Sequence, residues 1–250
     1  CAKWRNGAGG ICDMDRYFEK TPEVRKYDWT GFVRAPADGV TVVSKIRGEV
    51  EKRLASDKAS TPMKAGDIAK VGDTVATGFD SSVWLNTGFG SIIVQPLTQL
   101  RLDKFELNAL RRSGRAFLST GSVGAIIQQP AVIRSDFSVA TPSGANASIR
   151  GSEMQVGYDE VSKLTTVFVY EDKAYVQGGA DQEETEVSEG KKITVDENGS
   201  VLSQENLTET DRAGRPIATV RPRTKNRLWV GGGVLVLGVL AIFGLAGVMR

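Results

Sequence analysis

The chain has 250 residues, of which 40% are hydrophobic, 7% aromatic and 25% charged. Its 32 Lys and Arg residues nearly balance 30 Asp and Glu residues, so the net charge of +2 provides no global positive field to attract nucleic acid. Histidine is absent, which excludes Ser-His and Cys-His catalytic pairs and every imidazole metal site. Asp or Glu pairs acting as acid and base are the enzymatic alternative, but no P-loop, GxSxG or paired-carboxylate signature occurs, so we expect a protein that is not an enzyme and has no metal and no cofactor.

Residues 1–40 come first and show no regular apolar period, so we predict an irregular N-terminal arm. The arm carries six aromatic residues among many charges, and we expect them to cover the edge of a neighbouring domain rather than to bind a ligand. These aromatic residues are Trp4, Tyr17, Phe18, Tyr27, Trp29 and Phe32.

The two cysteines, Cys1 and Cys12, both lie in this arm. They are too few for a thiolate zinc site and do not form a CxxC pair, but an oxidising compartment would allow them to close one loop. If a signal sequence was cleaved before Cys1, that residue is expected to carry lipid as in a bacterial lipoprotein. The alternative is that the sequence starts at an arbitrary point.

Between residues 41 and 202, short runs of alternating apolar and polar residues are separated by Gly, Asp, Asn, Pro and Ser. The predicted strands include residues 41–44, 82–85, 91–94, 99–102, 137–140, 147–150, 153–157, 165–170, 174–177 and 192–195. Their starts recur about every 8 to 12 residues, which is typical of a sandwich, barrel or solenoid rather than of βαβ units. Residues 103–113 fit neither apolar period well and are predicted as a strand followed by a loop. The sequence therefore predicts an all-β domain over residues 41–202.

Residues 41–200 resemble the FecR domain of bacterial envelope proteins. The resemblance begins with VVSKIRGEVEKR, continues through PMKAGDIAKVGDTVATGFDSSVWLNTGFG, and includes FSVATPSGANASIRGSEMQVGYD and TTVFVYEDKAYVQG in the family's order. The most specific portion pairs TPSG at residues 141–144 with IRGS at residues 149–152. The resemblance implies a β-solenoid-like stack of short strands, in which each rung covers the next. In the family's anti-sigma members a membrane span precedes the domain, whereas the apolar segment of this chain follows it.

The hallmark unit of this resemblance contains the candidate binding residues, which are Thr141, Pro142, Gly144, Arg150 and Gly151. Pro142 fixes its own φ and keeps Thr141 extended, while Gly144 permits the chain reversal that follows. Arg150 is expected to point away from the preceding isoleucine and to clamp turn carbonyls or a carboxylate such as Asp136, Glu153 or Asp159. The alternative for Arg150 is that it receives an anionic partner.

Residues 203–227 are polar, contain two prolines and have no apolar face, so they are predicted to form an extended linker. Residues 228–249 contain no charged residue and exceed the roughly 20 residues that cross a bilayer core as a helix. Trp229 follows Leu228 at the start of this segment, where an indole suits the membrane interface, and Met249 ends it. We predict one C-terminal transmembrane helix that serves as a membrane anchor.

Two orientations of this anchor follow from different observations. Basic residues precede the segment, which favours a tail-anchored protein with its β domain in the cytoplasm. The FecR resemblance favours a periplasmic or other extracytoplasmic domain, because long exported domains obey flanking charges less strictly. We expect the exported orientation. The predicted function is that of a non-catalytic sensing, signalling or scaffold module of the envelope that contacts an envelope protein. The alternative function is binding of cell wall or polysaccharide.

Overall fold

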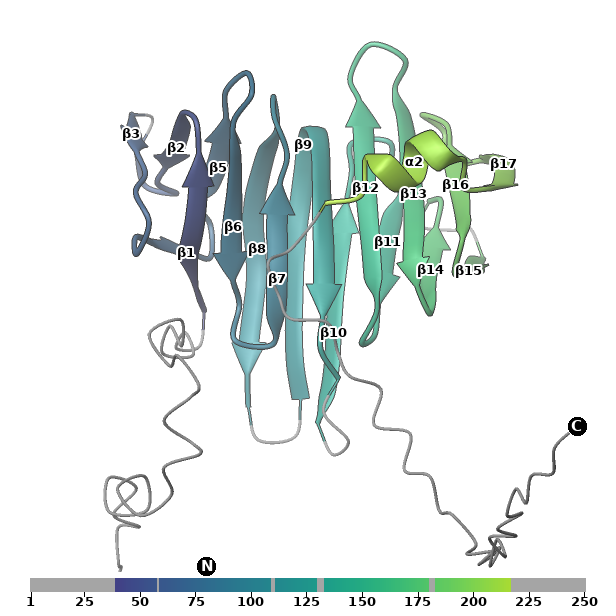
Figure 1. Cartoon of the computed structure of the whole chain (residues 1–250), viewed down its shortest axis with the longest axis horizontal. Coiled ribbons are helices and arrows are strands. Elements are labelled where there is room, and N and C mark those ends of the chain that lie inside the picture. The colour runs from purple at the N-terminus through teal and green to yellow at the C-terminus, as the bar shows by residue number, and fades with distance from the viewer. Residues whose placement is uncertain (1–38, 58, 109–110, 130–132, 180–182, 217–250) are drawn as a thin grey trace, which may run out of the picture. The chain divides into compact units, whose positions relative to one another are not determined.

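The computed structural model of the chain describes residues 39–216 except 58, 109–110, 130–132 and 180–182. This part contains seventeen strands and one short helix, α2 (Glu209–Ala213), which confirms the all-β prediction (Figure 1). The predicted arm up to residue 38, Cys1 and the predicted membrane segment 228–249 lie outside the described residues. Within residues 39–216, no helix has the length and apolar character needed to cross a bilayer.

The strands form two layers, here named sheet A and sheet B, and β9 belongs to both. Sheet A runs in the order β4–β1–β6–β7–β9–β12–β13–β16–β17. Its strands are β4 (Ile68–Lys70), β1 (Val40–Arg47), β6 (Ser82–Asn86), β7 (Gly90–Val94), β9 (Arg111–Ile127), β12 (Glu153–Asp159), β13 (Leu164–Glu171), β16 (Lys191–Val195) and β17 (Val201–Asn206).

Sheet B runs in the order β3–β2–β5–β8–β9–β10–β11–β14–β15. Its further strands are β3 (Ser60–Pro62), β2 (Val50–Arg53), β5 (Thr74–Thr77), β8 (Gln99–Leu107), β10 (Arg134–Ala140), β11 (Asn146–Ile149), β14 (Lys173–Gln177) and β15 (Glu184–Ser188). Among the described strands, β9 and β10 form the one parallel pair and the other neighbours are antiparallel.

Strand β9 passes from one sheet to the other at Gly121. Residues 111–120 pair with β8 in sheet B, and residues 121–127 pair with β12 and β7 in sheet A. Gly121 has φ +90°, and a Cβ there would lie 2.3 Å from Oγ1 of Thr98. Only glycine meets both conditions, so this residue allows a single long strand to join the two layers.

The core lies between the two sheets and follows from the period-2 alternation of the strands. In β13, Thr165, Val167 and Val169 are buried while Thr166 and Phe168 between them are partly exposed. One inward row crosses seven strands of sheet A in register. This row consists of Ile46, Val83, Val94, Val123, Val156, Val167 and Ile193.

An aromatic cluster fills the core beneath β8, β9 and β10. Phe105 lies 6.5 Å from Phe89 and 6.3 Å from Phe137, measured between ring centroids. Gly114 of β9 makes room for these rings, since a Cβ there would lie 2.8 to 3.1 Å from all three. Such offset aromatic contacts add to the stabilisation from the buried area itself.

Each predicted strand overlaps an observed strand, although β1 and β8 extend well beyond the predicted ends, and the structure adds other strands. The largest addition is β9, whose glycines at 114, 121 and 124 interrupt the apolar alternation that sequence reasoning requires. Residues 103–107 end β8, in line with the predicted strand, and residues 111–113 begin β9 where a loop was predicted. From β10 onward, successive hairpins lie in alternate sheets: β10–β11 and β14–β15 in sheet B, and β12–β13 and β16–β17 in sheet A. The solenoid arrangement implied by the family resemblance stays a prediction.

Candidate functional site

The predicted TPSG turn lies between β10 and β11, and its hydroxyl groups point inward. Thr141, Ser143 and Thr165 are buried, and their hydroxyl oxygens lie 2.8 to 3.0 Å from one another. The N–H of Thr141 donates to the carbonyl of Ala145, and that of Gly144 donates to the carbonyl of Thr141. These groups satisfy one another, so the geometry explains this part of the unit as a stabilised corner.

The remaining candidate residues of the hallmark unit are two exposed side chains and two glycines with positive φ. Pro142 is exposed, and Gly144 and Gly151 have φ values of +79° and +66°. Arg150 is exposed and its guanidinium carbon lies 5.1 Å from the centroid of the Tyr175 ring. Arg150 therefore stacks on an aromatic ring instead of clamping a carboxylate, and its role in binding a partner stays a prediction.

A second constellation, which the sequence did not predict, lies on the outer face of sheet A. After β17 the chain turns back across this face as a segment that we name the strap, residues 207–216 (Figure 1). Leu207 is buried and its N–H donates to the carbonyl of Gly190 over 2.7 Å. At the other end Pro216 packs on β9, where a Cβ on Gly124 would lie 2.5 Å from its Cγ. The strap thus connects the edge of sheet A with its middle.

Helix α2 forms the centre of the strap and begins with a capping box. The hydroxyl of Thr208 accepts from the N–H of Asp211 over 3.1 Å, and the Asp211 carboxylate accepts from the N–H of Thr208 over 2.8 Å. This reciprocal pair satisfies two donors at the helix start and stabilises a helix of only five residues.

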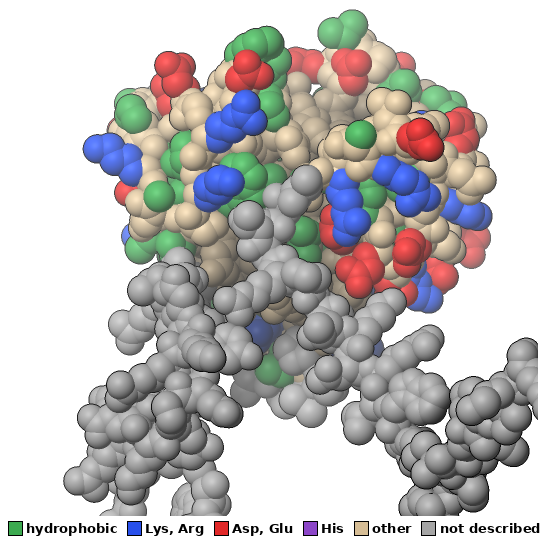
Figure 2. Space-filling model, in the orientation of Figure 1, with side chains coloured by type: hydrophobic (Ala, Val, Ile, Leu, Met, Phe, Trp, Pro, Cys, Tyr) green, Lys and Arg blue, Asp and Glu red, His purple; other side chains and the backbone are tan. Residues whose placement is uncertain are grey.

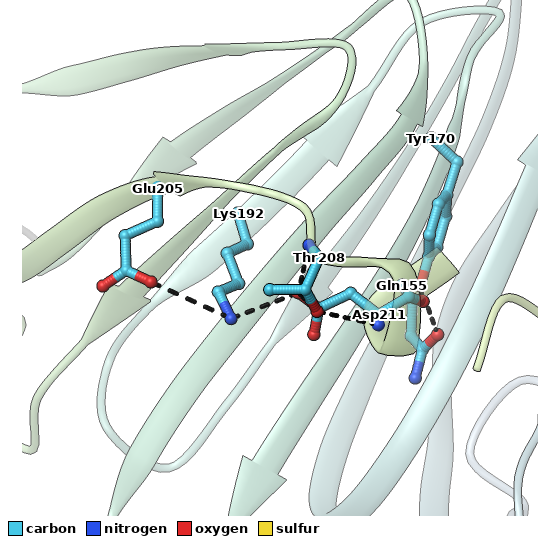
Figure 3. Close-up of polar contacts among 6 residues, drawn as sticks. All are labelled: Gln155, Tyr170, Lys192, Glu205, Thr208 and Asp211. Atoms are coloured by element: carbon cyan, nitrogen blue, oxygen red, sulfur yellow. Dashed lines mark hydrogen bonds and ion pairs between the residues drawn. The ribbon is translucent and has the colours of Figure 1, made fainter. Parts of the chain in front are cut away.

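Polar side chains fasten this helix to the sheet beneath it (Figure 3). The hydroxyl of Tyr170 lies 3.0 Å from Oε1 of Gln155 and 3.1 Å from the carbonyl oxygen of Asp211. The ammonium of Lys192 lies 3.2 Å from the carboxylate of Asp211 and 3.9 Å from that of Glu205. Strands β13 and β16 of sheet A therefore hold the strap directly through their outward side chains.

An ion pair between Arg215 and Glu153 completes the attachment. The guanidinium binds the carboxylate through both Nε and Nη2, with Nε 2.6 Å from Oε1, and its carbon lies 5.5 Å from the centre of the Tyr170 ring. The Glu153 side chain is only 6% exposed, whereas that of Arg215 is 44% exposed. A nearly buried carboxylate thus depends on a partner that the strap supplies.

The environment shifts the pKa values of three groups in this network. Burial, followed by the negative charges of Asp211 and Glu153, raises the pKa of Tyr170 to about 12. Hydrogen bonds from Thr208 lower the pKa of Asp211, and the hydrogen bond to Glu153 raises the pKa of Arg215. At neutral pH all these groups therefore keep the protonation states that hold the strap in place.

The network ties one part of the chain to another rather than forming an open reaction centre. Figure 2 shows this face of the molecule, where acidic and basic side chains lie next to one another around α2. Among the described residues no three Cys, Asp or Glu side chains are placed to hold a metal ion. These contacts between the strap and sheet A fix the position at which the chain leaves the β domain.

The strap overlaps the segment predicted as a polar linker, residues 203–227. In the structure residues 203–206 complete β17 and residues 207–216 are attached to sheet A, with only Leu207 and Pro216 buried, so the extended linker does not describe this part. The available signal was the pattern Thr208-x-x-Asp211, which is close to a capping box. The contacts of Arg215 and Pro216 had no signal in the sequence, because they join residues far apart along the chain.

Comparisons with known proteins give a weak structural likeness. No protein-family model matches the chain, and no curated protein matches its sequence. Two crystal structures of a protein proposed to be an anti-sigma factor, from Parabacteroides distasonis, are similar at 17% identity with a TM-score of 0.42. The likeness covers 53% of this chain and 59% of that protein, which is less than two thirds of its length.

Proposed function

We propose that this chain is a non-catalytic binding module of the bacterial envelope: a FecR-like β domain that residues 228–249 hold at a membrane and that acts through protein-protein contacts. The observation that carries the proposal is the strap. It uses ten residues and a set of matched polar groups to attach the end of the β domain to the middle of sheet A. Such an attachment is expected where the following segment serves as a tether.

The geometry of the strap supports a tethering role for a mechanical reason. Without it, the chain would leave the domain from β17, an edge strand whose residues are mostly exposed. A pull on that strand would open the β16–β17 ladder one residue at a time. With it, a pull on residue 216 acts first on the Arg215–Glu153 pair and on the bonds of α2, which lie side by side across three strands. The edge of the domain is therefore protected.

The tether is tested by alkaline carbonate extraction of membranes from cells that express the full chain. We expect the chain to stay in the membrane pellet. The double variant Val239→Arg with Ile242→Arg should be extracted, because each central arginine costs about 2.5 to 3.5 kcal/mol in a membrane helix. The control is Val220→Arg, which lies before the apolar segment and should leave extraction unchanged. If the unmodified chain is extracted, the membrane part of the proposal fails.

The side of the membrane is tested by adding protease to intact spheroplasts. An exported domain should lose its attachment within residues 217–227 and appear as a released β domain, while a cytoplasmic domain should be degraded only after lysis. The FecR resemblance supports the first result, and the basic residues before position 228 would support the second. A released domain that is stable to further digestion would also confirm that the strap stays packed.

A further inference from the structure

The outer face of sheet B carries a cluster of cations over β8, β9 and β10, which we name the basic face. Its members are Arg101, Lys104, Arg111, Arg115 and Arg134. The burial patterns of the three strands leave these side chains exposed, while the residues between them contribute to the core. The basic face lies on the opposite layer from the strap, so the chain's own C-terminal segment does not pack on it up to residue 216.

The register of the strands places like charges directly opposite each other at two points. Lys104 of β8 faces Arg115 of β9, and Arg111 of β9 faces Arg134 of β10. In an antiparallel pair such as β8 and β9, directly opposed residues on one face have Cβ atoms about 4.5 to 5.5 Å apart, and like charges there destabilise the sheet. Wherever carboxylates do not compensate this repulsion, it is unfavourable for folding, and the cations there are candidates for a role in binding.

Carboxylates neutralise only part of this charge. Asp103 lies 2.6 Å from Arg101, Glu106 lies 2.9 Å from Lys104, and Asp136 lies 3.1 Å from Arg111. Within the described part of the chain, Arg115 and Arg134 have no carboxylate partner. The face thus presents two uncompensated guanidinium groups among paired ones.

Two aromatic residues on the outer face of sheet B extend the contact surface around Arg115. Arg101 stacks on Phe117 at 4.9 Å, so it covers an apolar ring next to Arg115 on the same strand. In the other direction the row that contains Arg115 continues in register through Ser138 and Ser148 to Tyr175. Arginine and aromatic residues on a flat, rigid surface are the residue types that dominate binding energy at protein interfaces.

We propose that the basic face binds an acidic segment of a partner protein, with carboxylates of that segment on Arg115 and Arg134. The guanidinium fork matches a carboxylate in two parallel hydrogen bonds. Three carboxylates already interspersed on the face oppose a polymer charged at every unit such as nucleic acid, whereas a protein segment whose carboxylates are spaced apart can place them on Arg115 and Arg134. This inference rests on the proposed function, which it extends by naming the partner's chemistry and the surface that receives it.

The test measures binding to the full 250-residue chain in detergent micelles, so that its outcome does not depend on membrane placement. The probe is a fluorescent twelve-residue peptide with Glu at alternate positions, because alternate residues of an extended chain point to one side. Charge reversal through Arg115→Glu with Arg134→Glu should weaken binding at least tenfold. The matched control, Lys64→Glu with Lys70→Glu, changes net charge equally at exposed positions away from this face and should change affinity less than twofold.

Stability separates this role from a structural one. Arg115→Glu places a carboxylate opposite Lys104, so the doubly reversed chain should be as stable as the original or more stable in thermal unfolding. A peptide with Lys in place of Glu should regain binding to it. The proposal is overturned if the acidic peptide does not bind, if both double variants lose affinity equally, or if oligo-dT or phosphatidylglycerol vesicles bind the same residues as tightly as the peptide.

Discussion

The strap can be displaced at one point by adding a single carbon atom to sheet A. In Gly124→Ala the new Cβ would lie 2.5 Å from Cγ and 2.8 Å from Cβ of Pro216, and the three nearest atoms all belong to this proline. The distance falls about 1 Å short of ordinary contact between carbon atoms. Because β9 is paired on both sides there and Pro216 ends the strap, the strap rather than the strand should move.

The expected size of the effect follows from what holds the strap. Overpacking costs about 1 to 3 kcal/mol where the surroundings cannot yield. The strap can yield, so the cost appears as easier opening of residues 207–216 rather than as lost stability of the whole domain. A shift of about 1.4 kcal/mol in that local equilibrium corresponds to tenfold more frequent opening. We therefore expect amide exchange in α2 to accelerate about tenfold, with a small change in the unfolding temperature.

Hydrogen exchange at the amides of Arg212, Gly214 and Arg215 provides the measurement, since each donates within the strap. The matched control is Gly157→Ala, on the outer face of the same sheet, where the nearest atoms lie 3.9 Å from the new Cβ. That variant should leave strap exchange unchanged. Unchanged strap exchange in Gly124→Ala, or equal acceleration in both variants, would refute the packing of Pro216 on β9.

Three further predictions concern single groups. Arg215→Ala should destabilise the strap more than Glu153→Gln in exchange measurements, because the first leaves a nearly buried carboxylate without its partner while the second leaves a guanidinium whose side chain is 44% exposed. Since the pKa of Tyr170 is raised from 10.0 to about 12, its contribution to stability should be constant below pH 10 and decrease as the pH rises to about 12; urea unfolding at several pH values should show this slope, and Tyr170→Phe should remove it. Gly151→Ala should lower the unfolding temperature more than Gly144→Ala, because both have positive φ but only the first also crowds a side chain, at 2.4 Å; equal losses would contradict the crowding.

Sequence reasoning identified strands in which side chains alternate and missed those in which they do not. Strands β13 and β14 bury every second residue, so their hydrophobic period of 2 was visible. In β9 the positions that pack against aromatic rings, the bend and the strap are all glycine. Each glycine has a reason that depends on residues distant in sequence, and sequence alone shows only a break in the pattern.

The predicted hallmark unit illustrates a different limit. Its residues were correctly placed at a turn between strands, with glycine where the chain reverses. Which of them bind a partner did not follow, because the inward direction of Thr141 and the stacking of Arg150 depend on contacts with β13 and β14. The network of the strap was also hidden, since its partners are separated by tens of residues along the chain.

The two layers differ in how their outer charges are used. On sheet A, Glu153 and Lys192 are matched by Arg215 and Asp211 of the strap, so the chain supplies its own counter-charges. On sheet B, Arg115 faces a like charge and the described residues provide it with no carboxylate. The strap therefore compensates Glu153 and Lys192 on sheet A, whereas no described segment compensates Arg115 on sheet B. The repulsion between Lys104 and Arg115 on sheet B is the feature from which we infer an acidic partner, because carboxylates of such a partner would supply the missing counter-charge.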